Sequence, residues 1–174
     1  MEVWGCLTWF GKPPLIFIER PLMLRNGRQV KQPFRAPDYV AKILRPSMPK
    51  IKQIFNDHGV QDRHWTFQQD GDAKHTSNLV QNWLSNNMVN FVAKDEWPAG
   101  SPDLSIIENV WSIMDTELAH KKPRGGWQSR AEFKNAIKDV WKHKITEKLV
   151  RRLFRSIPNR MLQVQQHQGG GSDY

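Results

Sequence analysis

Two acidic residues, Asp70 and Glu108, occupy the positions that most constrain this chain. Residues 65–69 are rich in aromatic and β-branched side chains and predict a strand that ends at Asp70. A proline-rich loop over 97–105 leads into apolar residues at helical spacing, which predict a helix over 106–120 with Glu108 on its first turn. Carboxylates at such element ends can converge on one edge of a sheet and bind a hard cation. Spacing alone is more typical of two unrelated surface acids.

The remaining hydrophobic pattern predicts a mixed α/β fold with strands early and helices late. The predicted strands are 2–9 and 15–18, which would pair as a hairpin, together with 65–69 and 89–93. The predicted helices begin near Asp38 (interrupted at Pro46), Thr76 or Ser77, Ile106, the capping box Ser129–Glu132, and Thr146. Gly59 is expected to end a helix, and Gly71 is expected to allow a tight turn with positive φ.

A chain of 174 residues has the length of one domain, and we assign residues 1–162 to it and 163–174 to a flexible polar tail. Residues 20–37 stand apart as a basic insertion with prolines and glycine and without an acidic residue. A loop that contacts phosphates and a solvated insertion explain that composition equally well. The basic residues of the insertion are Arg20, Arg25, Arg28, Lys31 and Arg35.

The charge balance is compatible with an anionic partner and also with a basic protein that has no polyanion partner. Lys and Arg outnumber Asp and Glu by 26 to 17, for a net charge of +9, which favours nucleic acid over a membrane. Residues 121–160 are especially basic, so their helices present either a DNA-facing surface or an ordinary solvated face. The lone Cys6 excludes an internal disulfide and fits a reducing compartment. The sequence predicts neither a signal peptide nor a membrane span.

Two longer motifs resemble one known family. Residues 67–77, FQQDGDAKHTS, resemble the second catalytic block of the mariner-like DDE transposases. Residues 101–111, SPDLSIIENVW, resemble the third block, which typically reads SPDLNPIENLW, with Ser105 and Ile106 in place of Asn and Pro. Shorter matches at 3–6, 14–19, 97–98 and 156–160 extend the resemblance over nearly the whole chain except residues 20–37.

The resemblance implies an RNase H-like fold and an Asp, Asp, Glu triad that holds two Mg²⁺ or Mn²⁺ ions for DNA strand cleavage and transfer. By position, Asp70 corresponds to the second acid and Glu108 to the third. The family's first acid ends a strand ahead of the hairpin that begins here at Val3, and neither Asp38 nor Asp62 follows such a strand. We therefore expect an incomplete RNase H-like fold that lacks its first strand, and a chain that is inactive by itself.

The resemblance also suggests roles for residues around the two acids. Asp103 is expected to brace the loop before Glu108. Lys74 and His75 lie beside the site and are candidates for DNA contact, although a local hydrogen bond at the start of a helix explains His75 at least as well. The nucleic-acid contacts that we predict are Lys74, His75, Lys121, Lys122 and Arg124.

The function expected from these features is that of a nucleic-acid-binding C-terminal part of a DDE transposase. Its partners would be transposon-end and target DNA in the nucleus, with a homodimer or pairing with a full-length transposase as further possibilities. Two alternatives remain at this point. The chain could be a non-catalytic DNA-binding protein that uses its basic helices, or a module that interacts with a transposase.

Overall fold

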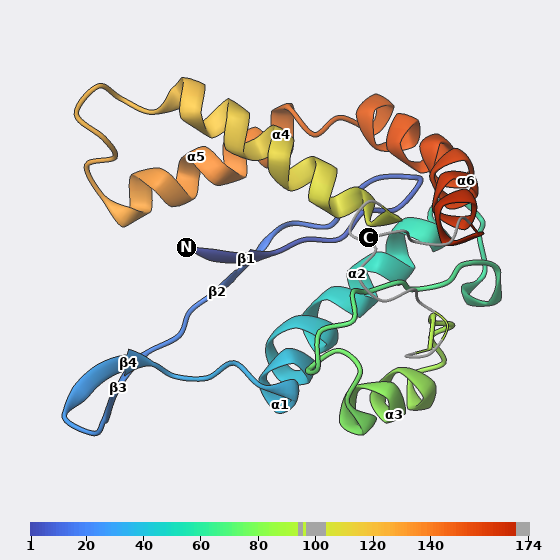
Figure 1. Ribbon diagram of the computed structural model, residues 1–174, viewed down its shortest axis with the longest axis horizontal. Helices are drawn as coiled ribbons and strands as arrows, with labels where there is room; N and C mark the ends of the chain where they lie inside the picture. The colour runs from blue at the N-terminus through green and yellow to red at the C-terminus, as the bar shows by residue number, and fades with distance from the viewer. Residues whose placement is uncertain (94–95, 97–103, 170–174) are drawn as a thin grey trace. The chain divides into compact units, whose positions relative to one another are not determined.

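The computed structural model describes residues 1–93, 96 and 104–169 (Figure 1). The chain divides into two compact units. The first consists of Met1–Cys6 and Lys12–Ala99, and the second of Leu7–Gly11 and Gly100–Tyr174. No described helix is long and apolar enough to cross a membrane.

The strands of the first unit form two separate antiparallel pairs. β1 (Glu2–Trp4) pairs with β2 (Ile16–Ile18), which confirms the hairpin expected at the start of the chain. β3 (Leu22–Arg25) pairs with β4 (Arg28–Lys31) inside the segment that was expected to be a basic loop. The residues between β3 and β4 are Asn26 and Gly27, with φ of 51° and 73°. Two consecutive positive φ values define a type I′ turn, and Asn-Gly is the dipeptide that favours it.

A long helical segment follows the second strand pair. It runs without a break through α1 (Ala36–Tyr39), a π-helical turn (Val40–Leu44) and α2 (Arg45–Asn56). The predicted interruption at Pro46 is therefore wrong. A proline has no N–H for the carbonyl four residues earlier, and the wider π turn directly before α2 accommodates that missing bond.

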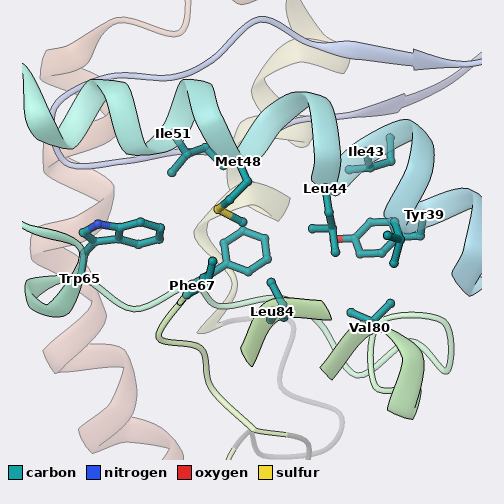
Figure 2. Close-up of a cluster of buried hydrophobic side chains, with 11 residues drawn as sticks. Tyr39, Ile43, Leu44, Met48, Ile51, Trp65, Phe67, Val80 and Leu84 are labelled. Carbon is teal, nitrogen blue, oxygen red and sulfur yellow. The ribbon is translucent and has the colours of Figure 1, made fainter. Parts of the chain in front are cut away.

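The core of the first unit lies between this helical segment and α3 (Asn78–Asn86). Ser77 caps α3, as predicted, because its Oγ accepts from the N–H of Val80 at 3.4 Å. Large apolar side chains meet in one buried cluster, drawn in Figure 2. Its labelled members are Tyr39, Ile43, Leu44, Met48, Ile51, Trp65, Phe67, Val80 and Leu84. Gly59 follows α2 with φ of 71°, in the stop position expected for it.

The predicted strands over 65–69 and 89–93 are reduced to one parallel bridge between Phe67 and Phe91. The N–H of Phe67 donates to Asn90 O at 2.6 Å, and the N–H of Val92 donates to Phe67 O at 3.0 Å. A longer strand needs hydrogen-bonding partners along its length, and these segments meet only at this bridge. The fold is mixed α/β as expected, but the described strands form two small antiparallel sheets, so the RNase H-like arrangement is not confirmed. Gly71 also differs from its prediction, because its φ is not positive.

The second unit is helical beyond residue 105. α4 (Ile106–Lys121), α5 (Arg130–His143) and α6 (Glu147–Gly169) begin where the sequence predicted. Ser129 Oγ accepts from the N–H of Glu132 at 3.0 Å, and Thr146 Oγ1 accepts from the N–H of Leu149 at 3.3 Å. α6 continues to Gly169, beyond residue 163 where the polar tail was expected to begin. The last part of that tail, from 170, lies outside the described residues.

Candidate functional site

Asp70 follows a segment that the core and one bridge hold in place. Trp65 and Phe67 are buried, and Phe67 forms the bridge to Phe91. The ring of Trp65 also stacks on that of Phe55, with centroids 4.7 Å apart. Three residues beyond the bridge, the chain leaves the core and Asp70 reaches the surface, with 60% of its side chain exposed. The sequence therefore places this carboxylate where a buried segment ends.

The carboxylate of Asp70 is oriented by two hydrogen bonds to a single oxygen. Oδ1 accepts from the N–H of Asp72 at 3.1 Å and from Nδ1 of His75 at 2.5 Å. Nδ1 must carry the proton of this bond, because an ionised carboxylate can only accept. The His75 bond is the main reason why the pKa of Asp70 lies below its ordinary value. Asp70 is thus ionised at neutral pH, with both described hydrogen bonds at Oδ1.

His75 is itself fixed from several sides. Its ring lies 4.3 Å from that of Tyr39, centroid to centroid, and the residue is 8% exposed. The backbone carbonyl of His75 accepts from the side-chain amides of Gln69 at 3.2 Å and Gln81 at 3.1 Å. Burial limits the freedom of the imidazole, so the direction of its Nδ1–H toward Asp70 is well defined.

Tyr39 completes this support. It is 1% exposed, and its hydroxyl donates to Gln69 Oε1 at 2.9 Å. Burial raises the pKa of Tyr39 well above its ordinary value, which keeps the phenol neutral and able to donate. A chain of contacts thus runs from Tyr39 through Gln69 and His75 to the Asp70 carboxylate. Nε2 of His75 is buried and has no hydrogen-bond partner among the described residues.

Lys74, a predicted DNA contact, is engaged with its neighbour Asp72. Its N–H donates to Asp72 Oδ1 at 2.9 Å, and its Nζ pairs with Oδ2 at 2.5 Å. Partial burial opposes ionisation of Asp72, but the hydrogen bonds from Lys74 outweigh it and leave the pKa of Asp72 below its ordinary value. In this arrangement His75 is turned inward and Lys74 is neutralised.

Glu108 lies on the first turn of α4, where the sequence placed it. It is exposed, and its N–H donates to Ser105 O at 3.1 Å. Ser105 is the N-cap residue, but its side chain makes no capping hydrogen bond to a described residue. The buried residues Ile106 and Val110 flank Glu108 and seat this end of the helix. Asp103 and the loop before it lie outside the described residues.

A polar link that the sequence did not reveal joins α4 to α6 beside Glu108. Asn109 Oδ1 accepts from Nη1 of Arg160 at 2.8 Å, and Nε of Arg160 donates to Ser156 Oγ at 2.9 Å. All three residues belong to segments that match the family motifs. Asn109 and Arg160 lie far apart in the sequence, and the only sequence signal for their contact is that both belong to motifs of the same family.

The donor chemistry of Asp70 and Glu108 suits a hard divalent cation, because both are exposed carboxylates. They belong to different units, and each is placed only within its own. The described residues contain no group of three or more His, Cys, Asp or Glu side chains that could hold a metal ion. The identity of the two ligands therefore stays a prediction.

The remaining predicted nucleic-acid contacts lie at and after the end of α4. Lys121 pairs with Asp139 on α5 at 2.7 Å. The same Asp139 accepts from His143 at 2.8 Å. The hydrogen bond from Lys121 and, to a smaller extent, that from His143 lower the pKa of Asp139. Lys122 and Arg124 are exposed just beyond the helix. Of these three predicted contacts, Lys121 has a carboxylate partner inside the chain.

Comparison with known proteins agrees with the motifs. No family model matches the chain. The chain is 37% identical over 112 residues to the transposase of transposable element Tcb1 of Caenorhabditis briggsae, an alignment that covers 64% of this chain and 38% of that protein. It is 28% identical over 173 residues to the Tc1 transposase of Caenorhabditis elegans, covering 99% of this chain and 54% of the relative. It is 30% identical over 112 residues to the Tc3 transposase of C. elegans, covering 64% of this chain and 32% of the relative.

The chain thus spans about half of the length of the Tc1 transposase and less of the other two. The Tc1 alignment includes nearly every residue described above. The homologues of this chain are therefore transposases of the Tc1/mariner family.

Proposed function

We propose that this chain is a DNA-binding part of a DDE transposase, in which Asp70 and Glu108 are two of the carboxylates that bind catalytic Mg²⁺ or Mn²⁺. The observation that carries the proposal is the state of Asp70. It lies in the motif shared with the family, its pKa is lowered, and its Oδ1 is oriented by His75. An ionised, oriented and half-exposed carboxylate is what a metal-dependent phosphoryl-transfer site requires.

The proposed division of labour follows from the geometry. His75 and the N–H of Asp72 hold Oδ1 of Asp70, which leaves Oδ2 for a cation. Glu108 would present its carboxylate from the exposed first turn of α4, whose start is fixed by buried Ile106 and Val110. An RNase H-like arrangement of the whole domain, as in the family, is part of the proposal.

Bound Mg²⁺ or Mn²⁺ would supply the charge that stabilises the attacking and leaving oxygens of a phosphodiester. A family site uses three acids, and the resemblance supplies two of them within this sequence. Two carboxylates hold a divalent ion weakly. We therefore propose that the chain by itself binds DNA but does not cleave it.

Charge as well as homology supports the proposal of DNA as the partner. The net charge of +9 favours a polyanion, and the proposed ligand is transposon-end and target DNA. A chromosomal DNA substrate implies a nuclear location. Pairing with another transposase molecule would be one way to complete the set of acids.

The first experiment measures Mn²⁺ binding to the purified chain by electron paramagnetic resonance. We expect weak binding that Asp70→Asn reduces several-fold, since one ligand is lost. Asp72→Asn is the matched control. It removes the same charge two residues from Asp70, and the carboxylate that it removes is already paired with Lys74. Equal affinity in the chain and in Asp70→Asn would refute the ligand assignment.

The second experiment tests DNA itself. Fluorescence anisotropy with duplex DNA should show binding that weakens as salt rises, and Asp70→Asn should retain it. Absence of binding at low salt would reject DNA as the partner. Nicking of transposon ends with Mn²⁺ that Asp70→Ala abolishes would instead show that the chain is an active enzyme. DNA binding without any effect of Asp70 or Glu108 on Mn²⁺ would favour a non-catalytic DNA-binding protein.

A further inference from the structure

The β3–β4 ribbon is the least buried secondary structure of the first unit. Every residue of β3 is exposed, and in β4 only Val30 is partly buried. Leu22 and Leu24 are 62% and 72% exposed, although leucine is usually covered. A two-stranded hairpin is marginally stable in water unless it packs against something. In Figure 1 the ribbon extends from β2 and α1 as a separate finger.

The base of this ribbon is anchored. Arg20 donates from Nε to Gln32 O at 2.8 Å and from Nη1 to Glu2 Oε1 at 2.8 Å. The N–H of Gln32 donates to Pro21 O at 2.9 Å, which extends the ladder below β3 and β4. Arg20 is thus a structural residue that ties the ribbon to β1. The anchored base leaves the tip as the part that is available to a partner.

The tip brings two like charges together. In the antiparallel register Arg25 lies directly opposite Arg28, and the Asn26-Gly27 turn keeps them there. Like charges directly opposite one another destabilise a strand pair. Neither arginine has an ion-pair partner among the described residues, and no acidic residue occurs from 20 to 37. A phosphate between the two guanidinium groups would convert this repulsion into charge-assisted hydrogen bonds.

The two faces of the ribbon divide their side chains in a way that suits a groove. Cross-strand partners share a face, so Met23 and Val30 lie beside the Arg25–Arg28 pair. The other face carries the exposed leucines together with Gln29 and Lys31. The major groove of DNA admits a two-stranded β-ribbon, with phosphates at its walls and thymine methyl groups on its floor. A second copy of this ribbon fits poorly, because it would oppose a basic surface with an identical one.

We propose that the β3–β4 ribbon, residues 22–31, is a duplex-DNA-binding finger whose Arg25 and Arg28 contact the phosphate backbone at the edge of a groove. This inference rests on the proposed function in taking DNA as the ligand. It assigns a specific surface and a mode of entry to that ligand. It also gives a role to the segment that the family resemblance does not cover.

The test compares two double variants of the full chain that lose equal charge. Arg25→Gln with Arg28→Gln removes the pair at the tip. Arg45→Gln with Lys50→Gln, both exposed on α2 in the same unit, is the matched control. Binding of each to a short fluorescent duplex is measured by anisotropy over a range of NaCl concentrations. Far-UV circular dichroism and thermal unfolding establish that both variants fold.

We expect the tip variant to bind about tenfold more weakly than the unmodified chain near 0.1 M salt, since two phosphate contacts are lost. The magnitude of the slope of log K against log salt should fall by about 1.8, because each of the two lost phosphate contacts contributes about 0.9. The control should change affinity by less than about threefold and leave the slope unchanged.

Three results would overturn the finger. Equal losses in the two variants would show that only overall charge matters. An unchanged affinity of the tip variant, in a chain that does bind DNA, would remove the ribbon from the interface and leave the proposed function intact. If the chain binds no DNA at low salt, both the proposed function and the DNA-binding finger are rejected.

A further pair, Leu22→Ser with Leu24→Ser, separates DNA from a protein partner. If the exposed leucines enter the groove, duplex affinity falls while the molar mass by light scattering stays the same. A change in molar mass without loss of duplex affinity would assign the ribbon to contacts between copies and reject the proposal.

Discussion

The carboxylate of Asp70 accepts hydrogen bonds from Asp72 and His75, whereas that of Glu108 lies exposed on the first turn of α4. The position of Asp70 depends on side chains: a buried imidazole, the tyrosine against it, and an amide between them. The position of Glu108 depends on where a helix begins. The two acids of one proposed site are thus placed by different physical means, and they should respond differently to mutation and to salt.

The largest expected effect comes from the segment that leads to Asp70. Phe67→Ala removes a buried ring and loosens the strand segment that the Phe91 bridge holds. We expect the free energy of unfolding of the first unit to fall by about 3–5 kcal/mol, measured by urea denaturation. Phe67→Leu should cost less, about 1.5 kcal/mol, because a smaller apolar side chain still fills much of the space of the ring. Equal losses in the two variants would show that packing volume is not what holds this segment.

His75→Ala tests whether Asp70 is placed by its side-chain partner. It removes a hydrogen bond to a charged group and the contact with Tyr39, at a cost of about 1–3 kcal/mol in the free energy of unfolding. The pKa of Asp70, followed by carboxyl carbon NMR, should rise toward its ordinary value. His75→Asn should keep it low, because asparagine places an N–H donor near the position of Nδ1. An Asp70 pKa that stays low in His75→Ala would assign the shift to another cause.

On the side of Glu108, the corresponding test is Asn109→Ala. It leaves the half-buried guanidinium of Arg160 without its acceptor on α4. A loss of about 1 kcal/mol in the free energy of unfolding of the second unit is expected. Asp115→Ala, at an exposed position in the middle of α4, is the control and should lie within about 0.5 kcal/mol of the parent chain. Similar losses in the two variants would show that the α4–α6 link does not stabilise the second unit.

Acid should weaken the surroundings of Asp70. Asp70 and Asp72 both have a lower pKa in the folded chain than the ordinary 3.8. The unfolded chain therefore binds protons first, so their stabilising effect is complete above about pH 4 and is lost as pH falls through the lower, folded pKa. In Asp70→Asn, less free energy of unfolding should be lost on acidification. The difference should be less than about 1 kcal/mol, since the Asp70 carboxylate is more than half exposed and solvent screens it.

Urea denaturation repeated from pH 2 to 6 measures this effect. An acid dependence that is the same in Asp70→Asn and in the unmodified chain would show that Asp70 does not contribute to it.

The smallest expected effect is that of Glu108→Gln at neutral pH. A carboxylate near a helix N-terminus gains about 0.3–1 kcal/mol from the helix dipole at low ionic strength. The loss in the free energy of unfolding should therefore shrink as salt is added. Asp115→Asn, in the middle of the same helix, serves as the control. A Glu108 effect that does not depend on salt would point to a specific partner instead of the dipole.

Local signals in the sequence predicted most of the helices. Ser77, Ser129 and Thr146 each cap the helix that follows them, and α4 begins with Glu108 on its first turn. These features depend on residues three or four positions apart, so neighbouring side chains are sufficient to identify them. The Asn26-Gly27 dipeptide is an equally local signal and is typical of a type I′ hairpin. The hairpin was not predicted because the segment was interpreted from its basic residues alone.

The sequence by itself determined which residues carry carboxylates, where the helices begin, and the kinship with Tc1/mariner transposases. Tertiary structure decided how far the strands at 65–69 and 89–93 extend, because a strand exists only where a partner meets it. For His75 the sequence allowed either a DNA contact or a local hydrogen bond, and tertiary structure decided that it faces Asp70 and not solvent. That orientation requires Tyr39, Gln69 and Gln81, which reach His75 from other helices and from the preceding segment, and residue spacing does not encode such contacts.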